Sequence, residues 1–136
     1  MLLRSVTGVA LLSLGAAVLT TPAWGWDSSE LAARVRGLES TGDLRSARQS
    51  LQQAVRANPR DGETLALWAA FLDQRRDPEA RAAYQQLLAL PALNPDLKRD
   101  ATRRLAALDL IAGDRESANR RLASLPSPSA LPPASS

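Results

Sequence analysis

Cysteine and histidine are both absent from the 136 residues of this chain. Without them the protein can form no disulfide, no thiolate or imidazole metal site, and no mechanism built on a cysteine nucleophile or a histidine base. Glycine-rich phosphate-binding loops and known nucleophile motifs are missing as well. These absences predict a protein that holds no metal and no cofactor.

Aromatic residues are also scarce, at 4% of the chain, which argues against nucleic-acid binding through base stacking. Lysine occurs once, as Lys98, although 17 basic and 14 acidic residues leave a net charge of +3. Basic and acidic residues are interspersed, whereas nucleic-acid binding needs a concentrated basic stripe. We therefore expect no nucleic-acid partner.

Paired carboxylates at helical spacing are the remaining route to acid–base catalysis. Three pairs have such a spacing: Asp27 with Glu30, Asp96 with Asp100, and Asp73 with Asp77. Two of these pairs include a residue expected to cap a helix, and none falls in a stretch expected to line a deep pocket. We therefore expect the protein not to be an enzyme.

A long apolar run occurs only at the N-terminus, where residues 1–25 carry Arg4 and an apolar segment over about residues 6–19. This is the layout of a secretory signal peptide, and the segment is short for a hydrocarbon layer of about 30 Å. We expect cleavage after Gly25, with cleavage after Ala23 as the second choice and an uncleaved membrane anchor as the alternative. Cleavage would leave a mature protein without a stable membrane span, exported to the periplasm or another extracytoplasmic compartment of a bacterium.

From Asp27 onward the hydrophobic pattern is helical, with no alternating stretch long enough for a strand. Capping and turn residues divide this region into six helices. Helix starts are predicted at Asp27, Asp43, Asp61, Asp77-Pro78, Asn94-Pro95 and Asp114, and helix ends at Gly42, Pro59, Pro91 and Gly113. The residues predicted to be buried are Leu31, Val35, Leu38, Leu44, Ala47, Leu51, Ala54, Val55, Leu65, Trp68, Ala69, Leu72, Ala80, Tyr84, Leu87, Leu88, Leu97, Ala101, Leu105, Leu108, Ala112, Ala118, Leu122 and Leu125. Residues 126–136 are rich in proline and serine and are expected to be disordered.

Two turns share the same residues, because Gly42-Asp43 returns as Gly113-Asp114 71 residues later. Arg76-Asp77 lies between them, 34 residues after the first turn, with arginine in place of glycine. A period of about 34 residues made of a helix, a turn and a helix is typical of the tetratricopeptide repeat.

The chain resembles the tetratricopeptide repeat family over roughly Ser28 to Leu125. Its first repeat is the best match, with Ala47, Leu51 and Ala54 at the pattern's positions in the second helix and Pro59 closing it. The third repeat departs from the pattern in its first helix, where Ala101 or Asp109 falls at positions expected to be large, depending on register. The resemblance implies an all-α domain over residues 26–125, made of three antiparallel helical hairpins stacked as a short right-handed superhelical α-solenoid.

Family resemblance also implies a function, because most such solenoids bind a peptide or helix of a partner in their concave groove. We therefore expect a non-enzymatic adaptor or scaffold of the cell envelope whose partner is a protein or peptide. The candidate partner-binding residues on the inner helices are Arg36, Glu39, Asp73, Gln74, Asp100 and Arg103. The alternative interpretation of these charged residues is a solvated surface.

Two further functions stay open at this point. Arginines gather toward the C-terminal end, namely Arg99, Arg103, Arg104, Arg115, Arg120 and Arg121, and they could bind a lipid head group, a polysaccharide or an acidic protein. Acidic neighbours make a solvated face the competing interpretation. An uncleaved N-terminus would instead make the protein a membrane-anchored assembly factor.

The uncapped last hairpin, with Leu110, Ile111 and Leu125, is either a docking surface, including one for self-association, or weakly protected core.

Overall fold

The computed structural model describes residues 27–126. This range contains six α-helices and no β-strand, so the all-α prediction is confirmed for it. The predicted signal peptide, residues 1–25, lies outside the described residues, as does the predicted tail after Pro126. No helix in residues 27–126 combines the length and the apolar character needed to cross a membrane.

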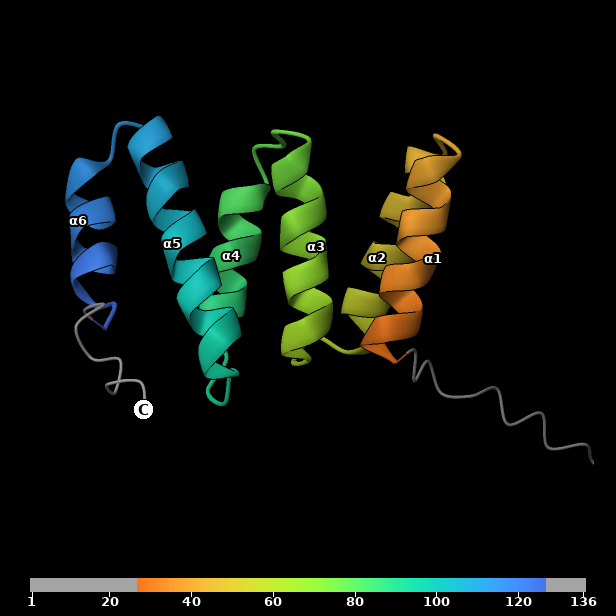
Figure 1. Ribbon diagram of the computed structural model, residues 1–136, viewed down its shortest axis with the longest axis horizontal. Coiled ribbons are helices and arrows are strands. Elements are labelled where there is room, and N and C mark those ends of the chain that lie inside the picture. The colour runs from red at the N-terminus through yellow and green to blue at the C-terminus, as the bar shows by residue number, and fades with distance from the viewer. Residues whose placement is uncertain (1–26, 127–136) are drawn as a thin grey trace, which may run out of the picture.

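The helices lie side by side in chain order, from α1 in orange to α6 in blue (Figure 1). Their bounds are α1 (Ser28–Ser40), α2 (Leu44–Ala57), α3 (Gly62–Gln74), α4 (Ala80–Leu88), α5 (Pro95–Ile111) and α6 (Arg115–Ala123). Each helix packs against the next one along the chain, and α3 also contacts α1 and α5. Within the described residues, α6 packs against α5 alone.

Side-chain caps begin four of these helices where the sequence predicts them. The carboxylates of Asp27, Asp43 and Asp114 and the amide oxygen of Asn94 accept hydrogen bonds from backbone N–H groups in the first turn of α1, α2, α6 and α5. Asp61 stands at the N-cap of α3 as predicted, but its carboxylate accepts from the Thr64 hydroxyl at 2.6 Å instead.

The start of α4 differs from the prediction by two residues, because the helix begins at Ala80 and not at Pro78. The carboxylate of Asp77 accepts from the Glu79 N–H at 2.9 Å, and the Ala80 N–H donates to the Asp77 carbonyl at 3.0 Å. These two bonds hold residues 77–80 in a turn, so Asp77 caps that turn and the helix follows it.

Three turns, between α1 and α2, α3 and α4, and α5 and α6, share one backbone conformation. Each has one residue with positive φ: Gly42 at 79°, Arg76 at 54° and Gly113 at 85°. In each turn that residue's N–H donates to the carbonyl three residues back, and the next N–H donates to the carbonyl five residues back. This pairing is the Schellman-type helix ending that usually has glycine at the left-handed position. Arg76 therefore occupies a site where the other two turns have glycine.

The shared turns also fix the register of α5, which the sequence leaves open. The carbonyls five residues back belong to Leu38, Leu72 and Asp109, so Asp109 occupies the position of a leucine in the other two helices. Asp109 is fully buried, as Leu72 is.

The buried core follows most of the predicted faces. Fully buried side chains include Leu31, Leu51, Leu65, Leu72 and Leu105. Phe71 is also buried, stacked beside Trp68 with ring centroids 6.2 Å apart, and the sequence analysis missed it.

Three residues predicted to be buried are exposed, namely Leu44, Ala112 and Leu122. Leu44 is the first residue of α2, and the buried face of that helix begins one turn later, at Ala47. Ala112 and Leu122 lie at the α5–α6 end, where no further described helix covers them.

Candidate functional site

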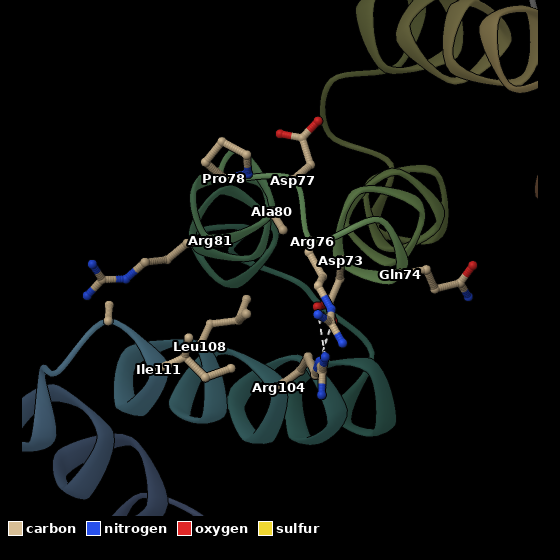
Figure 2. A pocket seen from close by; sticks show the side chains of 11 residues that line it. Asp73, Gln74, Arg76, Asp77, Pro78, Ala80, Arg81, Arg104, Leu108 and Ile111 are labelled. Atoms are coloured by element: carbon tan, nitrogen blue, oxygen red, sulfur yellow. Dashed lines mark hydrogen bonds and ion pairs between the residues drawn. The ribbon is translucent and has the colours of Figure 1, made fainter.

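A groove of about 750 Å³ opens between the C-terminal end of α3, the α3–α4 turn, the start of α4 and the C-terminal half of α5. Its lining comprises Asp73, Gln74, Arg76, Asp77, Pro78, Ala80, Arg81, Arg104, Leu108, Ile111 and Ala112. We call it the α3–α5 groove (Figure 2). Its volume falls in the range of sites that bind small molecules.

One end of the groove is apolar. Leu108 is half-buried against the core, while Ile111 is 79% exposed. Figure 2 shows these two side chains together on α5, across from Pro78 and Ala80. An exposed isoleucine of this kind leaves apolar surface that a ligand could cover.

Asp73 and Arg104 form an ion pair at the other end of the groove. The Nε and Nη2 groups of Arg104 both donate to the Asp73 carboxylate, Nη2 at 2.8 Å. This bidentate contact joins α3 to α5. The Tyr84 hydroxyl donates to the same carboxylate at 3.2 Å. Hydrogen bonding from Arg104 lowers the pKa of Asp73 despite the burial of that carboxyl group. Burial, with the nearby Asp73 charge, raises the pKa of Tyr84 to about 12.

Asp77 is neutralised by an arginine from a different helix. Arg48 of α2 donates to the Asp77 carboxylate at 2.8 Å and to Glu79 at 3.2 Å, and its guanidinium lies 5.4 Å from the Trp68 ring centroid. The hydrogen bond from Arg48 lowers the pKa of Asp77. Contrary to the sequence expectation, Asp73 and Asp77 both line a pocket, because the turn brings the end of α3 and the start of α4 to one wall.

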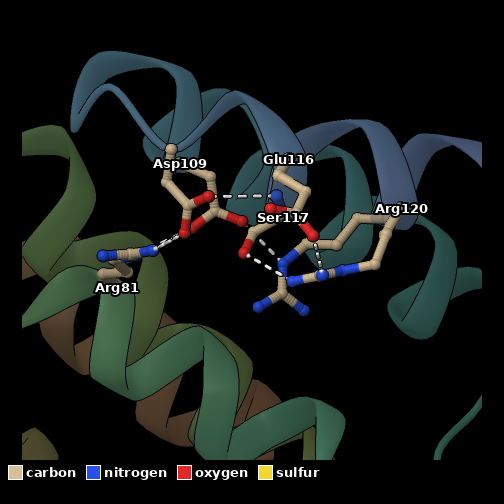
Figure 3. A network of polar contacts seen from close by, with 7 residues as sticks. Arg81, Asp109, Glu116, Ser117 and Arg120 are labelled. Carbon is tan, nitrogen blue, oxygen red and sulfur yellow. Dashed lines mark hydrogen bonds and ion pairs between the residues drawn. The ribbon is translucent and has the colours of Figure 1, made fainter.

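Asp109 is the centre of a second polar network (Figure 3). Its fully buried carboxylate accepts from Arg81 of α4 and from Arg121 of α6, each at 2.7 Å. Arg81 also donates to the carboxylate of Asp114 at 3.2 Å. The network therefore ties α4, α5 and α6 together, and it explains how an aspartate can replace a core leucine.

These ion pairs repeat from one shared turn to the next. Arg48 follows Ala47 in α2 and reaches Asp77, the residue after the left-handed position of the next such turn. Arg81 follows Ala80 in α4 and reaches Asp114, the equivalent residue of the turn after that. In α6 the residue after Ala118 is Asn119, so the series of arginines ends there.

Arg76 differs from the other charged residues of the groove. Its side chain is exposed and forms no hydrogen bond or ion pair with any described residue. Arg104 binds Asp73, Arg81 binds Asp109 and Asp114, and Asp77 accepts from Arg48. Figure 2 shows Arg76 directed toward the Asp73–Arg104 end of the groove.

The groove contains two of the six residues predicted to bind a partner, Asp73 and Gln74. Asp73 is buried and held by Arg104, whereas Gln74 is exposed on the rim. The remaining four lie outside the lining. Glu39 pairs with Arg75 at 2.8 Å, and Arg36, Asp100 and Arg103 are exposed.

Sequence reasoning did not select Arg76, Arg81 or Arg104 for the groove. Arg76 carries a detectable signal, because it stands where the repeat pattern has glycine. The pairing of Arg104 with Asp73, 31 residues away, has no local signal in the sequence.

Most arginines of the C-terminal cluster are paired with carboxylates of this chain. Arg99 pairs with Asp96, Arg104 with Asp73, Arg120 with Glu116 and Arg121 with Asp109. Two members of the cluster, Arg103 and Arg115, form no ion pair among the described residues. The cluster therefore offers less free positive charge than its sequence indicates.

Comparison with known proteins adds no assignment, since no protein-family model matches this chain and no curated protein matches it either. Within residues 27–126, no group of three or more acidic residues is arranged to hold a metal ion.

Proposed function

We propose that the protein is a non-enzymatic adaptor of the bacterial cell envelope that binds a segment of a partner protein in the α3–α5 groove. The observation that carries this proposal is the groove itself, with exposed Ile111 at one end and polar side chains at the other. Sites that combine apolar surface with a few oriented polar groups are typical of specific recognition. The two carboxylates in the lining are engaged by Arg104 and Arg48, which favours binding over acid–base catalysis.

The same proposal includes a tetratricopeptide-like arrangement of three stacked hairpins in a short right-handed solenoid. Three features support it: the turn conformation shared by Gly42, Arg76 and Gly113, the arginine pairs that recur between those turns, and the row of helices in Figure 1. In such a stack the odd-numbered helices line the concave surface. The contacts of α3 with α1 and α5 agree with that placement.

Placement in the cell envelope rests on the predicted signal peptide over residues 1–25. Sequencing the N-terminus of the protein recovered from soluble and membrane fractions tests it. A mature start at Trp26 or Trp24 in the soluble fraction is expected. A start at Met1 in the membrane fraction would instead favour a membrane-anchored assembly factor.

The adaptor function is tested by photo-crosslinking in the native host, with a photoreactive residue replacing exposed Gln74 on the groove rim. We expect a discrete protein adduct, which Ile111→Asp should abolish because it places a charge on the apolar end of the groove. The control carries the photoreactive residue at exposed Arg60, in the α2–α3 turn at the opposite ends of the helices (Figure 1). The proposal fails if Gln74 and Arg60 give the same adducts, or if Ile111→Asp changes nothing.

Exposed Arg103 and Arg115, which have no acidic partner among the described residues, support a second candidate, an anionic-surface binder. Binding to vesicles that contain an anionic lipid should then fall steeply with salt. It should also be lost on reversal of the charge at Arg103 but not at Arg36. Equal binding to neutral vesicles would exclude this candidate.

A further inference from the structure

We infer that the segment bound in the α3–α5 groove is acidic, with an Asp or Glu near a large apolar residue, and that Arg76 binds its carboxylate. This inference rests on the proposed adaptor function, because it names the chemistry of the partner at the same groove. Three features support it: the charges that line the groove, the backbone conformation of Arg76 and the apolar end of the groove.

Most charged side chains that line the groove are paired within the chain. Asp73 is satisfied by Arg104 and Tyr84, and Asp77 by Arg48. The guanidinium of Arg76 is the lining charge left over, so the end of the groove where it lies with Arg104 and Asp73 has an excess of one positive charge. A carboxylate is the ligand group that complements it, and an arginine can bind a carboxylate through two parallel N–H groups.

Arg76 has a left-handed backbone conformation, with φ at 54°. A positive φ is unfavourable for a residue with a Cβ, and the two equivalent turns avoid the strain with Gly42 and Gly113. Arg76 accepts it although its side chain forms no hydrogen bond or ion pair with the described residues. Strained residues of this kind are concentrated at binding sites. A side chain that forms no hydrogen bond or ion pair among the described residues and still occupies the glycine position is best explained by contact with a ligand.

The apolar end of the groove indicates which residue accompanies the carboxylate in the bound segment. Exposed Ile111 and half-buried Leu108 lie together on α5, and Arg76 and Arg104 lie at the other end of the same groove (Figure 2). A ligand that fills both ends needs an apolar side chain and a carboxylate within a few residues of each other. An acidic residue alone would leave Ile111 exposed, and an apolar residue alone would leave Arg76 without a partner.

Peptide arrays test the inference. The probes are immobilised peptides in a glycine–serine background that carry one leucine, isoleucine or phenylalanine, with Glu, Gln or Lys placed one to four residues away. The protein used is the predicted mature chain, residues 26–136. We expect it to bind the Glu peptides about tenfold more tightly than the matching Gln peptides, and to bind the Lys peptides most weakly.

Arg76→Gly removes the guanidinium and relieves the left-handed strain, so this variant should fold at least as well as the wild type. It should bind the Glu peptides about tenfold more weakly and the Gln peptides unchanged, while Arg76→Lys should retain part of the preference for Glu. Arg60→Gly is the matched control, because it removes one exposed arginine from a turn at the far ends of the helices. It should leave every affinity unchanged.

The outcomes separate this inference from the proposed function. If peptides bind and Ile111→Asp abolishes binding, but Glu and Gln peptides bind equally or Arg76→Gly has no effect, the groove binds peptides and the acidic-partner inference is wrong. If no peptide binds the wild type better than it binds Ile111→Asp, both the inference and the proposed groove function are wrong.

Discussion

Tyr84 provides a test of the polar interior through its ionisation. It is the single tyrosine of the chain, so the ultraviolet absorbance of tyrosinate reports this residue alone. Tyr84 is 8% exposed, and its hydroxyl donates to the Asp73 carboxylate at 3.2 Å. Burial comes first among the causes that raise its pKa, and the charge of Asp73 second.

The magnitude follows from the pKa of about 12 in the folded protein, against an ordinary value of 10.0. Each pKa unit corresponds to about 1.4 kcal/mol, so the fold favours the neutral phenol by about 3 kcal/mol. Because the folded-state pKa is the higher one, this contribution is complete below pH 10 and is lost as the pH rises from about 10 to about 12.

The assay follows tyrosinate absorbance and the far-ultraviolet circular dichroism of the helices in one alkaline titration. We expect the helical signal to persist at pH values where an exposed tyrosine is already ionised. Asp73→Asn should lower the Tyr84 pKa, because it removes the nearby negative charge, yet leave it above 10 because the burial remains.

Two results would refute this reasoning. One is ionisation of Tyr84 near pH 10 while the helices are intact, which would mean that the ring is not desolvated. The other is an unchanged Tyr84 pKa in Asp73→Asn, which would mean that the carboxylate does not act on the phenol.

Three further predictions concern the free energy of unfolding, measured by urea denaturation with circular dichroism. Gly42→Ala should destabilise the protein by about 1 kcal/mol because it puts a Cβ at φ 79°, whereas Arg76→Gly should leave stability unchanged or raise it; equal losses in both would contradict the shared-turn interpretation. Asp109→Asn should destabilise it by about 2–3 kcal/mol, since two partly exposed arginines lose the buried negative charge and one of its two acceptor oxygens becomes an N–H donor. A loss below about 0.5 kcal/mol would show that the network contributes little. Leu51→Ala, at a fully buried site, should lower the free energy of unfolding by about 3 kcal/mol, while Leu122→Ala, at a site 45% exposed, should lower it by less than about 1 kcal/mol. Similar losses in the two variants would contradict the assignment of Leu51 to the core and of Leu122 to the surface.

Local chemistry allowed much of the fold to be predicted from the sequence. Caps such as Asp43 and Asn94 act within three residues of themselves, so their effect is visible in a short stretch of sequence. The positive φ of Gly42 and Gly113 follows from residue type in the same way. The exposure of Leu44 could not be found like this, because it depends on where a neighbouring helix begins to cover α2.

The candidate site was predicted less well, because it depends on contacts between distant residues. Arg104 with Asp73 and Arg81 with Asp109 are 31 and 28 residues apart, and nothing in the local sequence distinguishes these paired arginines from Arg103, which has no ion-pair partner among the described residues. The repeat pattern could have drawn attention to Arg76, since an arginine in place of a turn glycine needs an explanation.

The absence of an arginine at position 119 has a consequence for assembly. Arg48 and Arg81 each form an ion pair with the aspartate of the next shared turn. A contact that repeats in this way along a chain can in principle continue from one molecule to the next and form an open filament. Asn119 has no charged group to offer the Asp43 carboxylate of a following copy. The series of arginine–aspartate pairs therefore ends at α6 and cannot continue by the same contact into a second molecule. The apolar surface around Ile111 is nevertheless exposed.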